Sequence, residues 1–300
     1  MTSLPAIGTW FLAHEVGIRV GGFAVAFALV GAWERCRPAR TLRLSRGQRW
    51  VNNLALVVID TLLLRLFFPA AAVGFASLVA ARGWGVFNHL AVAPWLAGIV
   101  SVVALDLVVW LQHVLMHAVP ILWRVHRVHH ADPDYDLTTG TRFHPIEILL
   151  SMLVKCAAIA ALGAPVFAVL VFEVVLGTSA LFTHANARLP PRIDGVLRRL
   201  VVTPDMHRVH HSVAPDEATS NFGFNLSCWD RLFGTYRAQP RGGHDAMTIG
   251  VAGLTAPRDV IWLRGLLLLP FRPLPGSAAT PPAPVPGAPL GEEQARGTRR

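Results

Sequence analysis

One histidine-rich pentapeptide occurs twice in the sequence. HRVHH occupies residues 126–130 and recurs unchanged at 207–211. An HxxxH pair, His113 and His117, precedes the first copy. Residues three and four apart on a helix lie on one face, with Cβ atoms about 5–6 Å apart, so we expect each HxxHH to point three imidazoles at one spot. Because neutral imidazole is the commonest side-chain metal ligand, these motifs predict a metal site.

Two further histidines stand at the ends of apolar stretches, His144 in RFHPIE and His184 in HAN. An ordinary polar role is the alternative for each. One tetrahedral zinc needs three or four ligands, so the full set indicates two metal ions or a large redundancy. Imidazole binds iron, copper, nickel and zinc alike, so the ligands do not identify the metal. The candidate ligands are His113, His117, His126, His129, His130, His144, His184, His207, His210 and His211. The motif histidines among them are also the candidate catalytic residues.

The composition is that of a membrane protein. The mean hydropathy is +0.47, and 53% of the residues are hydrophobic while 15% are charged. Soluble domains have about a quarter of their residues charged. The formal net charge is +9. An anionic membrane surface is a better partner for this charge than nucleic acid, so we expect no nucleic-acid partner.

Five apolar stretches are long enough to cross or deeply enter a bilayer, which takes about 17–25 residues. They lie near residues 17–33, 53–80, 92–112, 146–163 and 165–182. The second contains Asp60 and Arg65 and is expected to be broken or partly interfacial, so four or five spans are predicted. The last two predict a tight helical hairpin. The predicted fold class is all-α, an integral membrane helical bundle with a cytoplasmic helical cap that holds a histidine-rich di-metal site.

The distribution of arginine predicts the orientation. Residues 34–50 contain six arginines, whereas the tip of the hairpin has none. Short cytoplasmic loops collect positive charge, so this loop is expected on the cytoplasmic side. If all five stretches cross, the three histidine motifs reach the same face. We therefore expect a multi-pass protein, of a bacterial inner membrane, with its active site on the cytoplasmic face.

The chain divides into four predicted regions. Residues 1–99 contain the N-terminal membrane helices and the basic loop, and residues 100–258 form the catalytic domain, including the hairpin 146–182. Residues 259–269 are too short to span and are expected in the interface, with a core helix as the alternative. The Pro- and Ala-rich residues 270–300 are expected to be disordered.

The chain resembles the fatty acid hydroxylase and sterol desaturase superfamily, whose members have HxxxH, HxxHH and HxxHH in this order. The similarity includes Asp106 and the segments PILWRVHRVHHADPD, TTGTRFHPIE, TPDMHRVHH and NFGFNLSCWDRLFGTY. It covers roughly residues 100–236. One departure is that Val114 follows the first histidine, where the family often has arginine. This change removes a cation but no expected ligand.

The resemblance implies a membrane-bound non-haem di-iron oxygenase that uses O2 to hydroxylate or desaturate a membrane lipid, such as a fatty acyl or sterol-like substrate. Two iron ions are the implied cofactor. Zinc outcompetes ferrous iron at many nitrogen sites and can replace it in overexpressed samples. No cytochrome b5-like domain is recognisable in the sequence. The electrons are therefore expected from a separate donor protein, a ferredoxin or a cytochrome b5-like protein with its reductase.

Three polar residues are expected to support the ligands. Asp106 lies two helical turns before His113 on the same face, so it is placed to hold an imidazole through its second ring nitrogen. Pairing of Asp106 with an arginine is the alternative. Glu147 follows His144 by three residues and is expected to orient it. Asn186, two residues after the histidine of HAN, belongs to the resemblance and is expected beside the ligands.

A histidine-rich membrane metal-binding or metal-transport protein is the alternative function. Transporters place polar ligands within spans, near the midplane, whereas these histidines cluster beyond the predicted span ends, which favours the oxygenase. A third hypothesis, a non-catalytic scaffold, is disfavoured because no expected ligand is missing. The sequence does not identify the substrate or the oligomeric state, and it does not separate hydroxylation from desaturation.

Overall fold

The computed structural model describes residues 4–273. Every regular element within them is helical, which confirms the predicted all-α class. The long helices are α1 (Leu4–Cys36), α2 (Arg46–Phe67), α3 (Ala71–Arg82), α4 (Pro94–Ala118), α6 (Pro145–Leu162) and α7 (Val166–Thr183). The predicted disordered tail lies outside the described residues, except for its first four positions.

Five stretches of helix are long and apolar enough to cross a membrane, as the sequence predicts. They are Ala13–Cys36, Arg46–Arg82, Pro94–Ala118, Pro145–Leu162 and Val166–Thr183. The second is broken between α2 and α3, but the break lies at Pro69 and not at Asp60 or Arg65, which are both inside α2. Proline lacks the amide donor of a continuous helix and disfavours helical dihedrals in the residue before it. Phe68 accordingly has φ −131° and ψ 67°.

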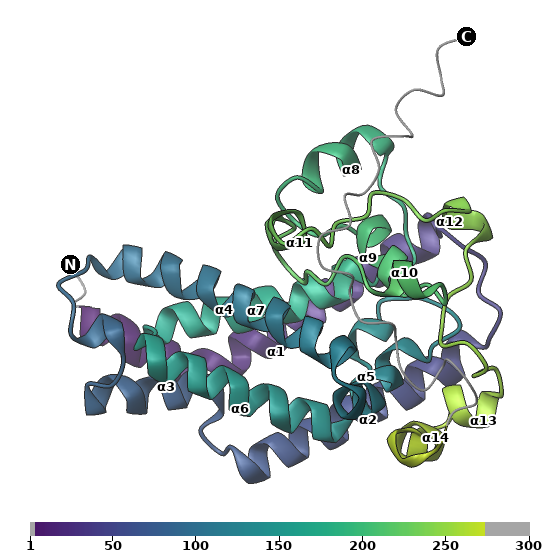
Figure 1. The fold of residues 1–300 in the computed structure, drawn as a ribbon. Helices are drawn as coiled ribbons and strands as arrows, with labels where there is room; N and C mark the ends of the chain where they lie inside the picture. The colour runs from purple at the N-terminus through teal and green to yellow at the C-terminus, as the bar shows by residue number, and fades with distance from the viewer. Residues whose placement is uncertain (1–3, 274–300) are drawn as a thin grey trace.

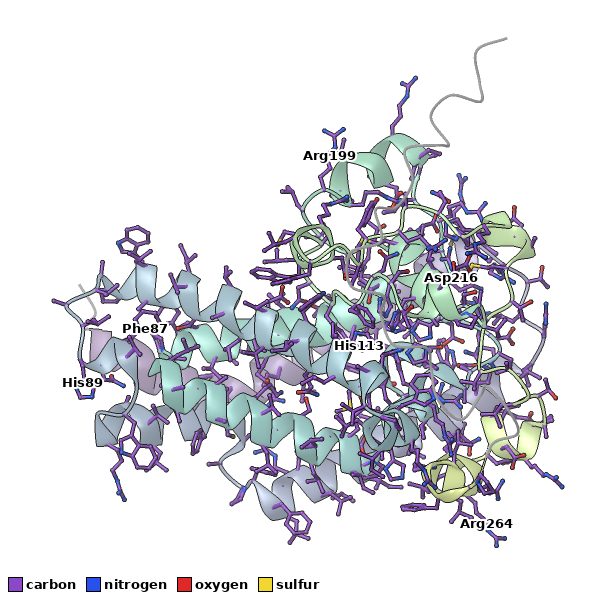
Figure 2. All side chains as sticks on the ribbon, viewed as in Figure 1. Phe87, His89, His113, Arg199, Asp216 and Arg264 are labelled. Atoms are coloured by element: carbon purple, nitrogen blue, oxygen red, sulfur yellow. The ribbon has the colours of Figure 1, made fainter. Side chains whose placement is uncertain are left out.

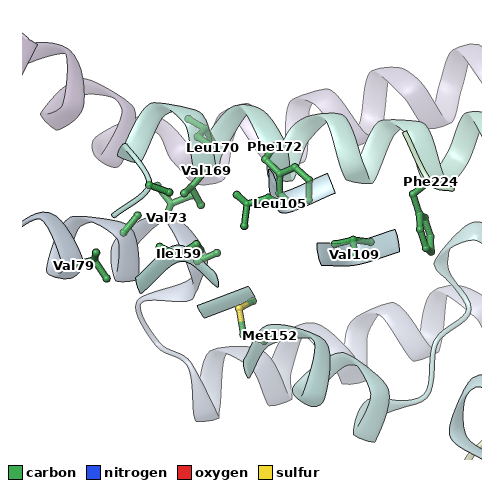
Figure 3. Close-up of a cluster of buried hydrophobic side chains, with 13 residues drawn as sticks. Val73, Val79, Leu105, Val109, Met152, Ile159, Val169, Leu170, Phe172 and Phe224 are labelled. Atoms are coloured by element: carbon green, nitrogen blue, oxygen red, sulfur yellow. The ribbon is translucent and has the colours of Figure 1, made fainter. Parts of the chain in front are cut away.

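The core of the bundle lies between α3, α4, α6 and α7 (Figure 3). Leu105 of α4, Ile159 of α6 and Phe172 of α7 are almost completely buried there. The turn at residues 163–165 joins α6 to α7, and Gly163 ends α6 with φ +69°, a left-handed conformation that glycine adopts without strain. Both helices pack against α4, which carries the first histidine pair.

The remaining elements form a cap, which we define as residues 119–144 and 184–273. Figure 1 shows its short helices gathered at one end of the bundle, opposite the N-terminus. They are α5 (Pro120–His130), α8 (Pro191–Leu197), α9 (Pro204–His210), α10 (Pro215–Ala218), α11 (Cys228–Leu232), α12 (Gly243–Ala246), α13 (Pro257–Val260) and α14 (Leu263–Leu268). Three 3-10 turns, η1 (Val86–Asn88), η2 (Thr139–Thr141) and η3 (Leu269–Phe271), complete the element list. The interfacial placement of residues 259–269 stays a prediction.

A sharp break between α4 and α5 brings two of the motifs together. Val119 has φ −98° and ψ 117°, the extended conformation favoured before proline. Pro120 then occupies the first turn of α5, where its missing N–H costs nothing. Because α5 turns back onto the end of α4, its histidines face His113 and His117.

Candidate metal centre

Nine of the ten candidate ligands meet where the bundle joins the cap. Figure 2 shows His113 at this junction. They form two groups, and within each group one ring nitrogen per histidine lies within 4.8 Å of all the others. The first group is His113, His117, His126, His130 and His210, and the second is His129, His184, His207 and His211. None of the nine is more than 2% exposed.

Each pentapeptide supplies ligands to both groups. In α5, His126 and His130 belong to the first group and His129 to the second. In α9, His210 belongs to the first, while His207 and the following His211 belong to the second. The expectation that each HxxHH points three imidazoles at one spot is therefore wrong, because residues i and i+4 share a direction that residue i+3 does not fully share. The two motifs interlock across two adjacent sites.

Backbone carbonyls fix the tautomer of several histidines. Nδ1 of His113 lies 2.7 Å from the carbonyl oxygen of Phe222, and Nδ1 of His210 lies 2.7 Å from that of Ser220. A carbonyl only accepts hydrogen bonds, so Nδ1 must be the protonated nitrogen in both rings. The Nε2 atom of each neutral ring then carries a lone pair. This is the arrangement in which metal-binding histidines are usually held.

The lone pairs converge without donors between them. Nε2 of His113 lies 3.0 Å from Nε2 of His126 and 3.0 Å from Nε2 of His210. Nδ1 of His126 lies 2.6 Å from a carboxylate oxygen of Glu147, so Nδ1 of this ring also donates and its Nε2 carries a lone pair. Three lone pairs facing one another at this distance repel unless a cation lies among them. The first group therefore fits a metal ion.

The second group has the same character. Nε2 of His184 lies 3.2 Å from Nε2 of His129 and 3.2 Å from Nε2 of His211, while its Nδ1 is 2.8 Å from the carbonyl oxygen of Ala180. Gly140 makes room for this ring, because a Cβ at that position would lie 2.9 Å from Nδ1 of His184. Both ring nitrogens of His207 are buried without a partner among the described residues.

The buried imidazoles of the cap are held in the neutral form that binds metals. Burial lowers the pKa of His184 from its ordinary value to about 3. Burial, reinforced by neighbouring histidines, also lowers the pKa of His130, His207 and His210 well below the ordinary value. Desolvation disfavours the charged form of a base, and neutral imidazole is the form that coordinates a metal.

His144 does not join either group. It is the N-cap of α6, and its Nδ1 accepts a hydrogen bond from the backbone N–H of Ile146 at 3.2 Å. Its Nε2 lies 3.2 Å from the carbonyl oxygen of Leu267. Both ring nitrogens thus face the backbone, which places His144 in the polar structural role that the sequence left as the alternative.

Asp106 acts on the centre through a loop and not through a direct contact with an imidazole. Its carboxylate accepts hydrogen bonds from Asn225 Nδ2 at 2.7 Å, from Trp229 Nε1 at 2.8 Å and from the backbone N–H of Leu226 at 3.2 Å. This loop presents the carbonyl of Phe222 to His113. Asp106 therefore holds the segment whose Phe222 carbonyl contacts His113, and the Asp106 carboxylate itself has no hydrogen bond to a histidine among residues 4–273.

Glu147 and Asn186 also differ from expectation. Glu147 orients His126 of the first group and not His144, because α5 packs against the start of α6. Asn186 contacts the backbone of Arg40 with both its side-chain oxygen and nitrogen. It ties the arginine-rich loop to the cap and touches no histidine ring within hydrogen-bonding distance.

A buried ionic network that was not predicted from the sequence lies next to the first pentapeptide. The guanidinium of Arg49 binds Asp132 at 2.6 Å and Asp136 at 2.5 Å, and none of these three side chains is solvent-exposed. Glu34 of α1 accepts hydrogen bonds from the backbone N–H groups of Leu137 and Asn186. The signal was present in the acidic run ADPDYD, which needs buried cations once it is placed beside a membrane bundle.

A cavity of about 310 Å³ opens from the first group into the bundle. His113 and His126 line its metal end, and Lys155 and Glu173 line it farther along α6 and α7. Apolar residues such as Val109, Leu64 and Phe224 form much of the wall, as is usual for sites that bind small molecules or lipids. The centre is thus reached from the membrane-embedded part of the molecule.

A sequence profile described as fatty acid hydroxylase matches residues 98–235. This segment, slightly less than half of the chain, is therefore similar to the fatty acid hydroxylase family. The matched segment contains most of α4, all of α5 to α7 and α9, and all nine clustered histidines. The resemblance to the superfamily that the motifs predicted is confirmed.

Curated relatives belong to the same superfamily. The ornithine lipid hydroxylase OlsE of Rhizobium tropici is 27% identical over 237 residues, which cover 76% of this chain and 69% of that protein. The alkylglycerol monooxygenase of Xenopus tropicalis is 34% identical over 124 residues, 41% of this chain and 27% of that enzyme. The human alkylglycerol monooxygenase is 30% identical over 127 residues, 42% of this chain and 27% of that enzyme. No solved structure matches the chain.

The similarity to fatty acid hydroxylases and the positions of the histidine groups bear on the two functions that the sequence suggested, a lipid oxygenase and a metal-binding or metal-transport protein. The named relatives are lipid hydroxylases and monooxygenases. His113 and His117 lie in the last turns of α4, and the other seven histidines lie outside the candidate spans. The lipid oxygenase hypothesis is therefore supported over metal transport.

Proposed function

We propose that this protein is an integral membrane lipid monooxygenase whose two histidine groups hold two iron ions. The observation that carries the proposal is the convergence of unprotonated Nε2 atoms from His113, His126 and His210 at the mouth of an apolar cavity. Iron held there supplies O2 activation and removal of hydrogen from an unactivated C–H bond. The chain supplies placement and tuning of the metals.

The protein residues have separable roles in this proposal. The nine clustered histidines are the ligands, and those of the three motifs are the catalytic residues. Glu147 fixes the ring of His126, and the backbone of the loop near Phe222 fixes His113. The cavity excludes bulk water and orients an apolar segment of the substrate beside the first group. Hydroxylation is proposed in preference to desaturation because the named relatives are hydroxylases and monooxygenases.

The cytoplasmic location of the centre is part of the proposal. The arginine-rich loop and the histidine groups lie at the same end of the molecule: the backbone N–H of Arg43 donates to Asp134 at 3.0 Å, and Arg40 donates to the carbonyl of Met247 at 2.7 Å. Since positive loops stay in the cytoplasm, this end faces the cytoplasm. Electrons then come from a separate soluble or membrane-associated donor protein.

Comparing lipid extracts of cells with and without the gene tests the function. Mass spectrometry should find a lipid that has gained one oxygen atom only when the wild-type gene is present, and a His210→Ala variant should not form it. A product that has lost two hydrogen atoms would instead assign desaturation. Unchanged lipids, with the protein present and iron-loaded, would contradict the proposal.

A further inference from the structure

The cavity that reaches the first histidine group contains acidic and amide oxygens that accept no hydrogen bond from residues 4–273. Asp60 of α2 lines this cavity and is only 7% exposed. Its Oδ1 has no hydrogen-bond partner among the described residues. Leaving a carboxyl group unpaired inside a membrane bundle is costly, and such residues usually mark a functional site.

Two further unpartnered acceptors line the same cavity. Oε2 of Glu147 is free of hydrogen bonds among residues 4–273, although its Oε1 binds His126. Oε1 of Gln112, the residue before the first ligand, is buried and also lacks a donor. The side chains of Asp60 in α2, Glu147 in α6 and Gln112 in α4 line the same cavity. All three unsatisfied atoms are acceptors, so the missing group is a donor.

The cavity lining also carries two cations, Arg19 and Lys155, and both lie beside one carboxylate, that of Glu173. Glu173 receives Lys155 on Oε1 at 2.6 Å and Arg19 on Oε2 at 3.2 Å. Both cations form ion pairs with Glu173, and neither forms one with Asp60 within 4.0 Å. Because the lining has three carboxyl groups, those of Asp60, Glu147 and Glu173, against two cations, its formal charge balance is acidic by one.

We propose that Asp60, with Glu147 and Gln112, binds an ammonium group of the lipid substrate inside the cavity. An ammonium group brings three donors and one positive charge, which matches three acceptors and an unpaired acid. A purely hydrocarbon chain or a sterol ring would leave these oxygens unsatisfied. The substrate class is thus an amphiphile with a primary amine near the carbon that is oxidised. This inference rests on the proposed lipid oxygenase function and specifies its substrate.

Equilibrium binding to the full-length protein tests the inference without turnover. The protein is loaded with zinc, which is redox-inert, and two probes of equal chain length are compared in the same detergent: dodecylamine and N-acetyl dodecylamine. Wild-type protein should bind the amine at least about tenfold more tightly, as expected for a desolvated charge pair. Equal affinity for the two probes in wild-type protein would overturn the inference, whatever the variants do.

Two variants of α2 locate the effect. Asp60→Asn keeps the size of the side chain and removes its charge, so the preference for the amine should largely disappear while the zinc content stays unchanged. Thr61→Val is the matched control, because it removes a hydroxyl from the neighbouring position on the same cavity wall and should keep the preference. A preference that survives Asp60→Asn would contradict the role of Asp60.

The same preparations separate this inference from the proposed function. Iron-loaded protein is supplied with reductant and total membrane lipid, and O2 consumption and oxygenated products are measured. Oxidation of lipids by a protein that shows no amine preference would overturn the inference alone. A clear amine preference in a protein that oxidises no lipid would overturn the proposed function alone.

Discussion

Nδ1 of His126 lies 2.6 Å from Oε1 of Glu147, and both side chains are buried. The carboxylate therefore holds one ring nitrogen while the other points into the first histidine group. A carboxylate in this position makes the opposite nitrogen a stronger donor to a metal. It also couples the start of α6 to the histidines of α5.

Replacement of Glu147 by glutamine should weaken metal binding without abolishing it. Loss of such a supporting partner typically costs about 10–100-fold in metal affinity. Competition with a chelator of known affinity, followed by metal analysis, measures the change. Ser151→Ala, one turn farther along the cavity-lining face of α6, is the control and should bind metal normally. Equal affinities of the Glu147→Gln and wild-type proteins would rule out the supporting role.

His144 and His210 should behave differently when each is replaced by alanine. His210 belongs to the first group, and its Nε2 lies 3.0 Å from that of His113, so its loss should reduce metal content and stop product formation. His144 contacts backbone groups, and its loss should leave the metal content unchanged while lowering thermal stability slightly through the lost helix cap. Elemental analysis of both purified variants decides, and equal metal loss in the two would show that His144 is a ligand.

Asp106→Ala should both destabilise the protein and lower its metal content. The substitution leaves the donors of Asn225, Trp229 and Leu226 without their acceptor, at about 1–3 kcal/mol for each buried group. The loop that presents the Phe222 carbonyl to His113 should then loosen. Thermal unfolding and metal analysis measure the two effects. Asp245→Ala removes an exposed carboxylate and should change neither quantity.

Arg49→Met should destabilise the cap strongly. It leaves Asp132 and Asp136 as buried carboxylates without their main cation, a change that typically costs about 3–5 kcal/mol. Lysine at this position restores the charge but not the bidentate geometry. The melting temperature of Arg49→Lys should therefore lie between those of Arg49→Met and the wild-type protein. Arg43→Met alters an exposed side chain whose residue contacts Asp134 through its backbone N–H, so its melting temperature should match wild type. A wild-type melting temperature for Arg49→Met would disprove the structural role of the network.

The sequence predicted the helical bundle and the histidines that cluster better than it predicted which side chains contact those histidines. Hydrophobic length is a local property, so the five spans followed directly from composition. The histidine motifs stand out by type and spacing. Which carboxylate meets which imidazole depends on how α5 folds back over α6, and the three-residue spacing of His144 and Glu147 held no information about that packing.

Two errors show the limit of reading one helix at a time. Asp106 and His113 are both in α4, as their spacing predicted. The carboxylate of Asp106 nevertheless contacts the loop of residues 221–230, and it is this loop that contacts the imidazole of His113. The three histidines of each pentapeptide share a helix face only approximately. Because their directions differ, they divide between the two histidine groups. Neither outcome is visible without the positions of the partner elements.

The sharing of each pentapeptide between the two groups has a consequence for how the centre is loaded. An ion bound by the first group would fix α5 through His126 and His130, and would fix α9 through His210. The same two helices carry His129 and His207 of the second group, and His211 directly follows α9. These side chains would therefore already be ordered when a second ion binds, at a lower cost in conformational entropy. Metal uptake should therefore be positively cooperative, and partly loaded preparations should contain empty and doubly loaded molecules with few singly loaded ones.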